Sequence, residues 1–263
     1  MASWLPWVRA RRANWRSTPL TEEQRAYLRR NVPMLRHLTP EVGERFEGLV
    51  QIFLHEKSFE GLGGLDLTEE MKLSIAGQAC FLLVGLVEVD VPYPGLDVIR
   101  VYPRSFKQLS GHADPFGTYR PPAGTVIGES SRRGYVVLAW DSVVRGGCTP
   151  HAADNVVLHE FAHQLDTQDG AADGAPVLPE GRMYGPWARI LGQVYDQLRH
   201  ELAEGRPDVL RAYGATNPAE FFAVATETFF EKPRRLQREH PELYDMMREY
   251  YRQDPAEWEQ DQP

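Results

Sequence analysis

Apolar residues recur at helical spacing through the first third of the chain. A capping box at Thr21 predicts the start of one helix, and Thr39, which precedes a proline, predicts the start of a second. A third helix is expected to begin near Asp66–Thr68 and to continue to Leu86, because its apolar residues return every three or four positions. Residues 21–92 are therefore predicted to be mainly helical.

Two segments further along the chain have the composition of strands. Asp97–Tyr102 and Tyr135–Val144 are rich in β-branched and aromatic residues and are bounded by glycine and proline. Between them, Ser110–Gly134 contains many glycine, proline and serine residues, which predicts a long loop that could cover a cleft. The second strand, over Tyr135–Trp140, is equally compatible with an edge that binds an extended peptide and with a covered core strand.

Helical spacing returns in the last part of the chain. Thr149, which also precedes a proline, predicts the start of a helix that reaches Leu165. Three further helices are predicted over Trp187–Leu202, Asn217–Phe230 and Pro241–Arg252. Many helices with a small number of strands predict the α+β class.

Composition and charge exclude two classes of protein. The chain has 263 residues, of which 42% are hydrophobic and 25% are charged, as in ordinary globular proteins and unlike disordered ones. Its net charge is -8, with 37 acidic and 29 basic side chains. Because such a charge repels a phosphate backbone, we expect no direct contact with nucleic acid.

Cysteine usage and apolar stretches predict a cytoplasmic protein. The two cysteines, Cys80 and Cys148, are far apart in sequence, which suggests neither a disulfide scaffold nor a thiolate zinc site and favours a reducing compartment. The most apolar stretch, Ala79–Val87, is much shorter than the roughly 20 residues that cross a bilayer. We therefore expect no transmembrane segment.

The N-terminus combines tryptophan with arginine. Met1–Arg16 has no continuous apolar stretch of the signal-peptide type. Such a mixture can lie on an anionic membrane surface, but we prefer a tail, loose or packed across the domain. We expect residues 1–20 to form this tail and residues 21–263 to form one compact unit, with a mainly helical portion (21–92) and a catalytic portion (93–263).

The candidate chemistry lies in the helix that is predicted to end at Leu165. His159-Glu160-Phe161-Ala162-His163 matches the His-Glu-x-x-His motif of zinc peptidases. Residues four apart share one face of a helix, so His159 and His163 can bind one zinc ion. Glu160 emerges beside them and can take a proton from the zinc-activated water. The alternative is two histidines with an incidental glutamate.

A catalytic zinc ion needs a third protein ligand. Glu220 is the best acidic candidate, but it stands three residues after the predicted cap Asn217, where a capping-box carboxylate also belongs. Spacing alone leaves the two interpretations even. Glu227, about two turns after Glu220, and Asp166 are candidates for orienting a zinc-bound histidine, although a solvated carboxylate is the preferred interpretation for each.

Two segments together resemble a known family. They are HEFAHQLD, His159–Asp166, and YGATNPAEFFAVATETFF, Tyr213–Phe230. They resemble the MtfA family of bacterial zinc peptidases, which is named for titration of the glucose-responsive repressor Mlc, and the resemblance runs through most of the chain. More distantly they resemble the catalytic domain of anthrax lethal factor. The resemblance implies a zincin-like fold with an N-terminal helical portion packed on a small sheet and metal-bearing helices.

The resemblance also implies roles for individual residues. His159, His163 and Glu220 would bind one zinc ion per chain. Glu160 would act as general base, and the hydroxyl of Tyr213 would stabilise the oxyanion. The alternative for Tyr213 is an aromatic ring packed at the entrance of a helix.

The predicted function is hydrolysis of peptide bonds by a zinc-activated water. Aminopeptidase action on short peptide substrates is the activity that the resemblance implies. The alternative is a regulatory binding protein that sequesters a transcriptional repressor of the Mlc type, with the zinc site secondary. A structural zinc clamp is disfavoured, because structural sites usually have four protein ligands, commonly including cysteine.

Overall fold

The computed structural model describes residues 6–86, 89–104, 134–148 and 154–258. The first half of the chain forms α1 (Pro6–Ser17), α2 (Glu22–Asn31), η1 (Pro33–His37), α3 (Pro40–Glu56), β1 (Ser58–Gly61), α4 (Glu69–Phe81), β2 (Val98–Tyr102), β3 (Tyr135–Ala139) and α6 (Trp140–Cys148). The second half forms α7 (Val156–Asp166), η2 (Gly181–Met183), α8 (Tyr184–Ala203), η3 (Ala212–Ala215), α9 (Pro218–Glu231), α10 (Pro233–Glu239), α11 (Pro241–Tyr251) and α12 (Pro255–Trp258).

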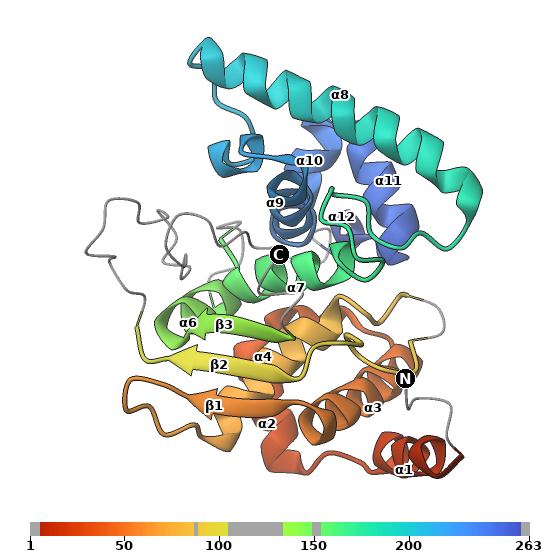
Figure 1. The fold of residues 1–263 in the computed structure, drawn as a ribbon, viewed down its shortest axis with the longest axis vertical. Helices are drawn as coiled ribbons and strands as arrows, with labels where there is room; N and C mark the ends of the chain where they lie inside the picture. Colours follow the sequence, from red (N-terminus) through yellow and green to blue (C-terminus); the bar gives the residue numbers. More distant parts are fainter. Residues whose placement is uncertain (1–5, 87–88, 105–133, 149–153, 259–263) are drawn as a thin grey trace.

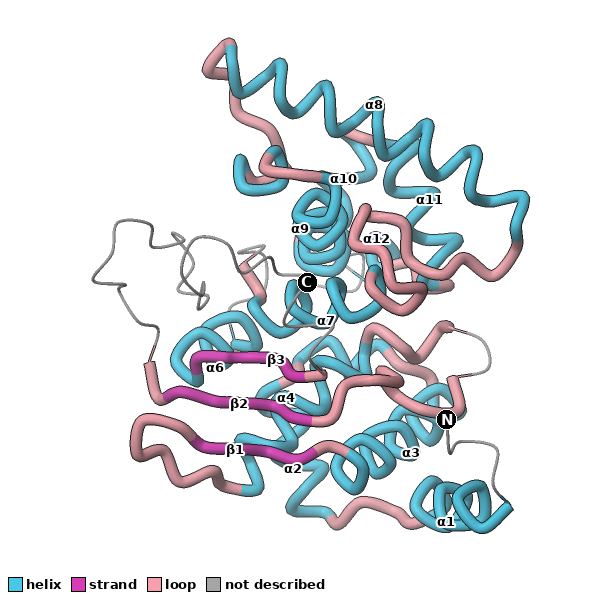
Figure 2. The backbone as a smooth tube through the Cα atoms, viewed as in Figure 1, coloured by secondary structure: helices cyan, strands magenta, loops and turns pink. Residues whose placement is uncertain are grey.

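The three described strands form one parallel sheet in the order β1-β2-β3 (Figure 2). Val98 of β2 pairs with Ser58 of β1 on one side and with Tyr135 of β3 on the other. Ile99 and Val101 are buried while their neighbours along β2 are half-buried, so one face of this strand packs into the core. Parallel strands need a crossover, which α4 provides between β1 and β2.

Helix α7 is the central element of the structure. In Figure 1 it lies between the sheet with helices α1 to α4 and the C-terminal helices α8 to α11. The ring of Phe161 packs against Phe53 of α3 at 5.7 Å and against Tyr93 at 4.7 Å. Ten of the eleven residues of α7 are buried, and Glu160 is the exception. The His-Glu-x-x-His segment is therefore held in the core.

Most of the predicted helices are present. The capping box is confirmed, since the backbone N–H of Gln24 donates to Thr21 Oγ1 and that of Thr21 to Gln24 Oε1. The helix after Asp66–Thr68 ends earlier than predicted, at Phe81, although Leu82, Leu83 and Val84 after it are buried. The helices after Thr39 and those around Trp187, Asn217 and Pro241 are confirmed; β1, α10 and α12 were not predicted.

Two boundaries around α7 were predicted wrongly. The second strand was expected to continue to Val144, but it ends at Ala139, because Trp140–Cys148 turns into helix α6. The helix expected to begin at Thr149 begins at Val156; residues 149–153 lie outside the described residues. Apolar, β-branched residues suit a buried helix as well as a buried strand, which explains the first error.

The N-terminal segment contains a helix, α1, that packs against α3. Val8 is buried in this contact, and Arg12 Nε donates to Glu56 Oε1 at 2.6 Å. Within the described residues, no helix is long and apolar enough to cross a membrane.

The start of α7 is fixed by Asn155. Its side-chain oxygen accepts hydrogen bonds from the backbone N–H groups of Val157 and Leu158, at 3.0 and 3.1 Å. Its side-chain N–H donates to Gln78 Oε1 of α4 at 2.9 Å, and both side chains are buried. One residue therefore caps the central helix and attaches it to the N-terminal part of the molecule.

We expect Asn155→Ala to lower the free energy of unfolding by about 2 kcal/mol or more. Loss of a cap costs about 1 kcal/mol, and the buried amide of Gln78 also loses its donor. Urea unfolding of the metal-free protein measures the change. Thr68→Ala is the matched control, because Thr68 caps α4 at an exposed position and should cost only about 1 kcal/mol. Equal losses in both variants would contradict the added role of the bond to Gln78.

Candidate metal centre

His159 and His163 lie on one face of α7, one helical turn apart. Their ring centroids are 4.8 Å apart, and their Nε2 atoms are separated by 3.2 Å. Both side chains are buried. The rings are nearly perpendicular, at 83°, and their Nε2 atoms converge on one point of the interior.

Glu220 reaches the two histidines from the first turn of α9. The side chain of Asn217 caps this helix by accepting a hydrogen bond from the backbone N–H of Glu220 at 2.9 Å. The Glu220 carboxylate points to the histidines, with Oε2 at 3.1 Å from His159 Nε2 and 3.5 Å from His163 Nε2. One ligand atom from each of the three buried residues lies within 4.8 Å of the others, so the group could hold a metal ion.

Glu227 holds the ring of His159 from the opposite side. Its Oε1 lies 2.7 Å from His159 Nδ1, and its Oε2 accepts a hydrogen bond from the backbone N–H of Asn155 at 2.8 Å. The guanidinium of Arg211 also contacts Oε1. A solvated carboxylate was the preferred prediction here, and it is wrong, because Glu227 is only 1% exposed. A carboxylate acceptor fixes the proton on Nδ1 and leaves Nε2 of His159 as a ligand atom.

Asp166 is also buried rather than solvated, with 0% of its surface exposed. Burial raises the pKa of its carboxyl group to about 6, while the backbone amides of Gly174 and Ala175 and the charge of His163 act in the opposite direction. Asp166 is thus a buried carboxyl group at the C-terminal end of α7.

The electrostatics of the cluster favour a cation at its centre. Burial alone would lower the pKa of His159, but hydrogen bonds with Glu220 and Glu227 raise it well above its usual range. Burial alone would raise the pKa of Glu220, but hydrogen bonds with His159 and His163 hold it well below its usual range. Because the carboxylates of Glu220 and Glu227 both contact the imidazole of His159, a positive charge between them is favourable. A bound metal ion can supply that charge in place of a proton.

Tyr213 and Glu160 lie beside the cluster. The hydroxyl of Tyr213 donates to Glu220 Oε1 at 2.9 Å, and its ring lies 5.9 Å from that of His159. Glu160 is half-buried, whereas the other ten residues of α7 are buried. The structure thus brings His159, His163, Glu220 and Tyr213 together, and Glu160 adjoins His159 on α7.

Two residues of this network were not predicted. Arg211, which contacts Glu227 and lies 3.6 Å from Asp154 Oδ1, belongs to no sequence pattern. Asn155 carries a signal that was missed, since it is a capping residue type directly before an apolar stretch. The predicted loop Ser110–Gly134 lies outside the described residues except for Gly134.

The chain is similar to known proteins over most of its length. The family model described as glucose-regulated metallo-peptidase M90 matches residues 5–252. An uncharacterized protein of Synechocystis sp. is 41% identical over 254 residues, which cover 96% of this chain and 90% of the relative.

Relatives with a descriptive name are more distant. Mlc titration factor A of Klebsiella pneumoniae is 31% identical over 236 residues, covering 86% of this chain and 84% of the relative. Mlc titration factor A of Escherichia fergusonii is 30% identical over 233 residues, covering 85% and 84%. The family model covers residues 5–252, and the chain contains a buried cluster of two histidines and a glutamate. The chain therefore belongs to the M90 family of zincin-like metallopeptidases, the family of Mlc titration factor A.

Proposed function

We propose that this protein is a zinc-dependent peptidase that hydrolyses short peptides, with aminopeptidase action. The observation that carries the proposal is the buried group of His159, His163 and Glu220 beside the half-buried Glu160, in a member of a metallopeptidase family. Imidazole nitrogen and carboxylate oxygen are common ligands of catalytic zinc, and three protein ligands leave one position open for substrate.

The proposed ligands are His159 and His163 through Nε2 and Glu220 through Oε2, for one zinc ion per chain. When bound, zinc supplies Lewis acidity to the substrate carbonyl and to a water molecule. Glu227 keeps the proton of His159 on Nδ1 and fixes the plane of the ring, with Arg211 holding the carboxylate in turn. This support favours a stable ligand geometry in a site that burial has already dehydrated.

Glu160 is the proposed proton carrier. Its carboxylate takes a proton from the attacking water and transfers it to the nitrogen of the leaving amine. The position suits this role, because Glu160 adjoins His159 in the helix and is the residue of α7 with access to solvent.

Tyr213 is the proposed donor to the oxygen of the substrate carbonyl as negative charge develops on it. Its hydroxyl donates to Glu220 Oε1 in the described structure, which supports a position within reach of that oxygen. To act, the hydroxyl would exchange this partner for the substrate oxygen. The neighbouring Gly214 packs closely on Val224, so the turn that carries Tyr213 is anchored to α9.

A second candidate function is the binding of a transcriptional repressor of the Mlc type. It is favoured by the relatives named Mlc titration factor A, at 30 to 31% identity over most of the chain. Binding and hydrolysis are separable, since Glu160→Gln should abolish hydrolysis and leave repressor binding unchanged. The cytoplasmic location expected from cysteine usage stays a prediction and would suit such a partner.

We expect the purified protein to bind about one equivalent of zinc, and His159→Ala and Glu220→Ala to lose it, because two remaining ligands bind weakly. Mass spectrometry of the metal content after dialysis measures this. Asn217→Ala is the matched control: it removes the cap of α9, at about 1 kcal/mol of stability, but no ligand, and should keep its zinc. Full zinc occupancy in Glu220→Ala would show that Glu220 is not a zinc ligand and would favour the capping-box interpretation.

Glu160→Gln should keep zinc and the fold but lose most hydrolysis of a chromogenic aminoacyl substrate, because an amide cannot take a proton from water. Glu242→Gln, an exposed carboxylate on α11, is the control for the loss of one negative charge. If Glu160→Gln and Glu242→Gln hydrolyse at the same rate, the proposed role of Glu160 is wrong.

Tyr213→Phe should lower kcat by about a hundredfold or more and leave zinc content unchanged, because it removes the donor to the developing oxyanion but keeps the ring. Steady-state kinetics with the same substrate measures kcat and KM separately. Tyr27→Phe is a matched control, since its hydroxyl donates to Glu23 Oε1 within α2, in the N-terminal part of the molecule. An unimpaired Tyr213→Phe enzyme would leave Tyr213 as a packing residue.

A further inference from the structure

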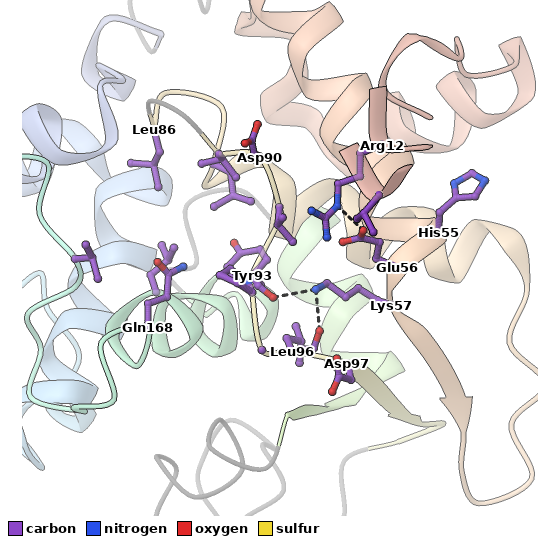
Figure 3. A pocket seen from close by; sticks show the side chains of 18 of the residues that line it. Arg12, His55, Glu56, Lys57, Leu86, Asp90, Tyr93, Leu96, Asp97 and Gln168 are labelled. Atoms are coloured by element: carbon purple, nitrogen blue, oxygen red, sulfur yellow. Dashed lines mark hydrogen bonds and ion pairs between the residues drawn. The ribbon is translucent and has the colours of Figure 1, made fainter. Parts of the chain in front are cut away.

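A second cavity, of about 950 Å³, lies at the C-terminal end of α7 (Figure 3). Its walls come from α1, the end of α3, the segment that leads into β2, and the segment after α7. Leu165 and Gln168 belong to the lining, whereas the histidines of the metal centre do not. The volume is that of a site for a small molecule, and neither the proposed catalysis nor the proposed zinc ligands use it.

Lys57 places a buried positive charge in this cavity. The residue is 7% exposed, and its ammonium group donates to the carbonyl oxygens of Tyr93 and Leu96 at 2.9 and 2.8 Å (Figure 3). An ammonium group has three N–H donors, and among the described residues no third acceptor and no ion-pair partner is found for it. Burial lowers the pKa of Lys57 to about 8, and the charges of Glu56 and Asp97 oppose this shift only in part.

The carboxylate of Glu56, next to Lys57 in sequence, is already paired with Arg12. Glu56 accepts a hydrogen bond from Arg12 at 2.6 Å, and Figure 3 shows this pair beside the Lys57 amine. The remaining acidic residues of the lining, Asp90 and Asp97, are exposed, so solvent screens their charges. The carboxylates of Glu56 and Asp97 therefore compensate the buried charge of Lys57 only in part, and neither pairs with it directly.

Arg11 also lines the cavity, as do Arg12, which pairs with Glu56, and Arg252. The guanidinium of Arg11 lies over the rings of Trp15 and Trp7, at 4.8 and 5.6 Å from their centroids. Within the described ranges it forms no ion pair with a carboxylate. Trp7, Arg11 and Arg12 of α1 thus form part of a cavity wall in a chain whose net charge is -8.

The rest of the lining is mainly apolar. It includes Val8, Leu83, Leu86 and Leu178, and Leu86 lies across the cavity from Lys57 in Figure 3. Such a surface, with one buried cation at one side, matches a ligand that has an anionic end and an apolar body. Because one buried ammonium group balances one negative charge, a monoanion fits better than a dianion such as phosphate.

We propose that this cavity is a binding site for a small amphipathic carboxylate, such as a medium-chain carboxylic acid. The carboxylate accepts the third N–H of Lys57 and faces Arg11, and the alkyl chain lies along Leu83, Leu86 and Leu178. The bound anion completes the counter-charge of the buried ammonium group and accepts its third N–H.

Isothermal titration calorimetry on the full zinc-loaded chain tests this with three probes of equal chain length. Octanoate should bind, 1-octanol should bind about tenfold or more weakly, and octyltrimethylammonium should not bind, because only octanoate pairs with the ammonium group. No binding of octanoate, or equal binding of octanoate and 1-octanol, would overturn the proposal, since an apolar groove alone does not distinguish the two.

Two variants locate the carboxylate. Lys57→Met, checked for its fold by circular dichroism, should weaken octanoate binding about tenfold or more and leave 1-octanol unaffected. Arg11→Glu should weaken octanoate binding several-fold by charge reversal, which does not disturb the interior because Arg11 is exposed. Arg9→Glu is its matched control, since Arg9 is exposed on the same helix and does not line the cavity. Parent affinity in Arg11→Glu, or equal losses in both arginine variants, would refute the assignment even if Lys57→Met failed to fold.

Discussion

The carboxylate of Glu227 is the contact on which the geometry of the metal centre depends. One oxygen holds His159 Nδ1, and the other accepts the backbone N–H of Asn155, so a single side chain of α9 fixes both the ring of a ligand and the start of the helix that carries it. These partners are 68 and 72 residues away in sequence. A buried carboxylate is costly unless it is paired and hydrogen-bonded, and Arg211 completes that requirement. The contact therefore orders two helices at once.

The same helix carries both negative charges that act on His159. Glu220 and Glu227 are seven residues apart, nearly two turns, so both side chains leave α9 on the face that meets α7. The other residues of α9 are mostly aromatic or aliphatic and pack into the core, among them Phe221 and Phe229. A line of polar groups thus runs through an apolar interior. Such a line is favourable when a cation joins it, which makes α9 a binding element rather than only a packing element.

Local signals in the sequence predicted the parts of the fold that depend on neighbouring residues. The motif from His159 to His163 and the cap at Asn217 needed only helical geometry. Strand β1 was missed because Ser58–Gly61 is short and mostly exposed, and its only signal is pairing with β2, about 40 residues away. The sequence also left open whether Glu220 is a capping residue or a metal ligand, because this choice depends on a contact between distant parts of the chain. Both roles place a carboxylate in the first turn of α9, and only its contact with His159 of α7 distinguishes them.

The segment after α7 contacts both the helix that carries Glu220 and the cavity that Lys57 lines. Gly174 passes so close to the start of α9 that a Cβ atom there would lie 2.5 Å from Pro218 O, and its carbonyl accepts a hydrogen bond from Trp187. Pro218 stands two residues before Glu220. Four residues after Gly174 in the same segment, Leu178 forms part of the cavity wall. The segment therefore contacts the first turn of α9 at Gly174 and the cavity at Leu178, because both residues are buried while Val177 between them is exposed.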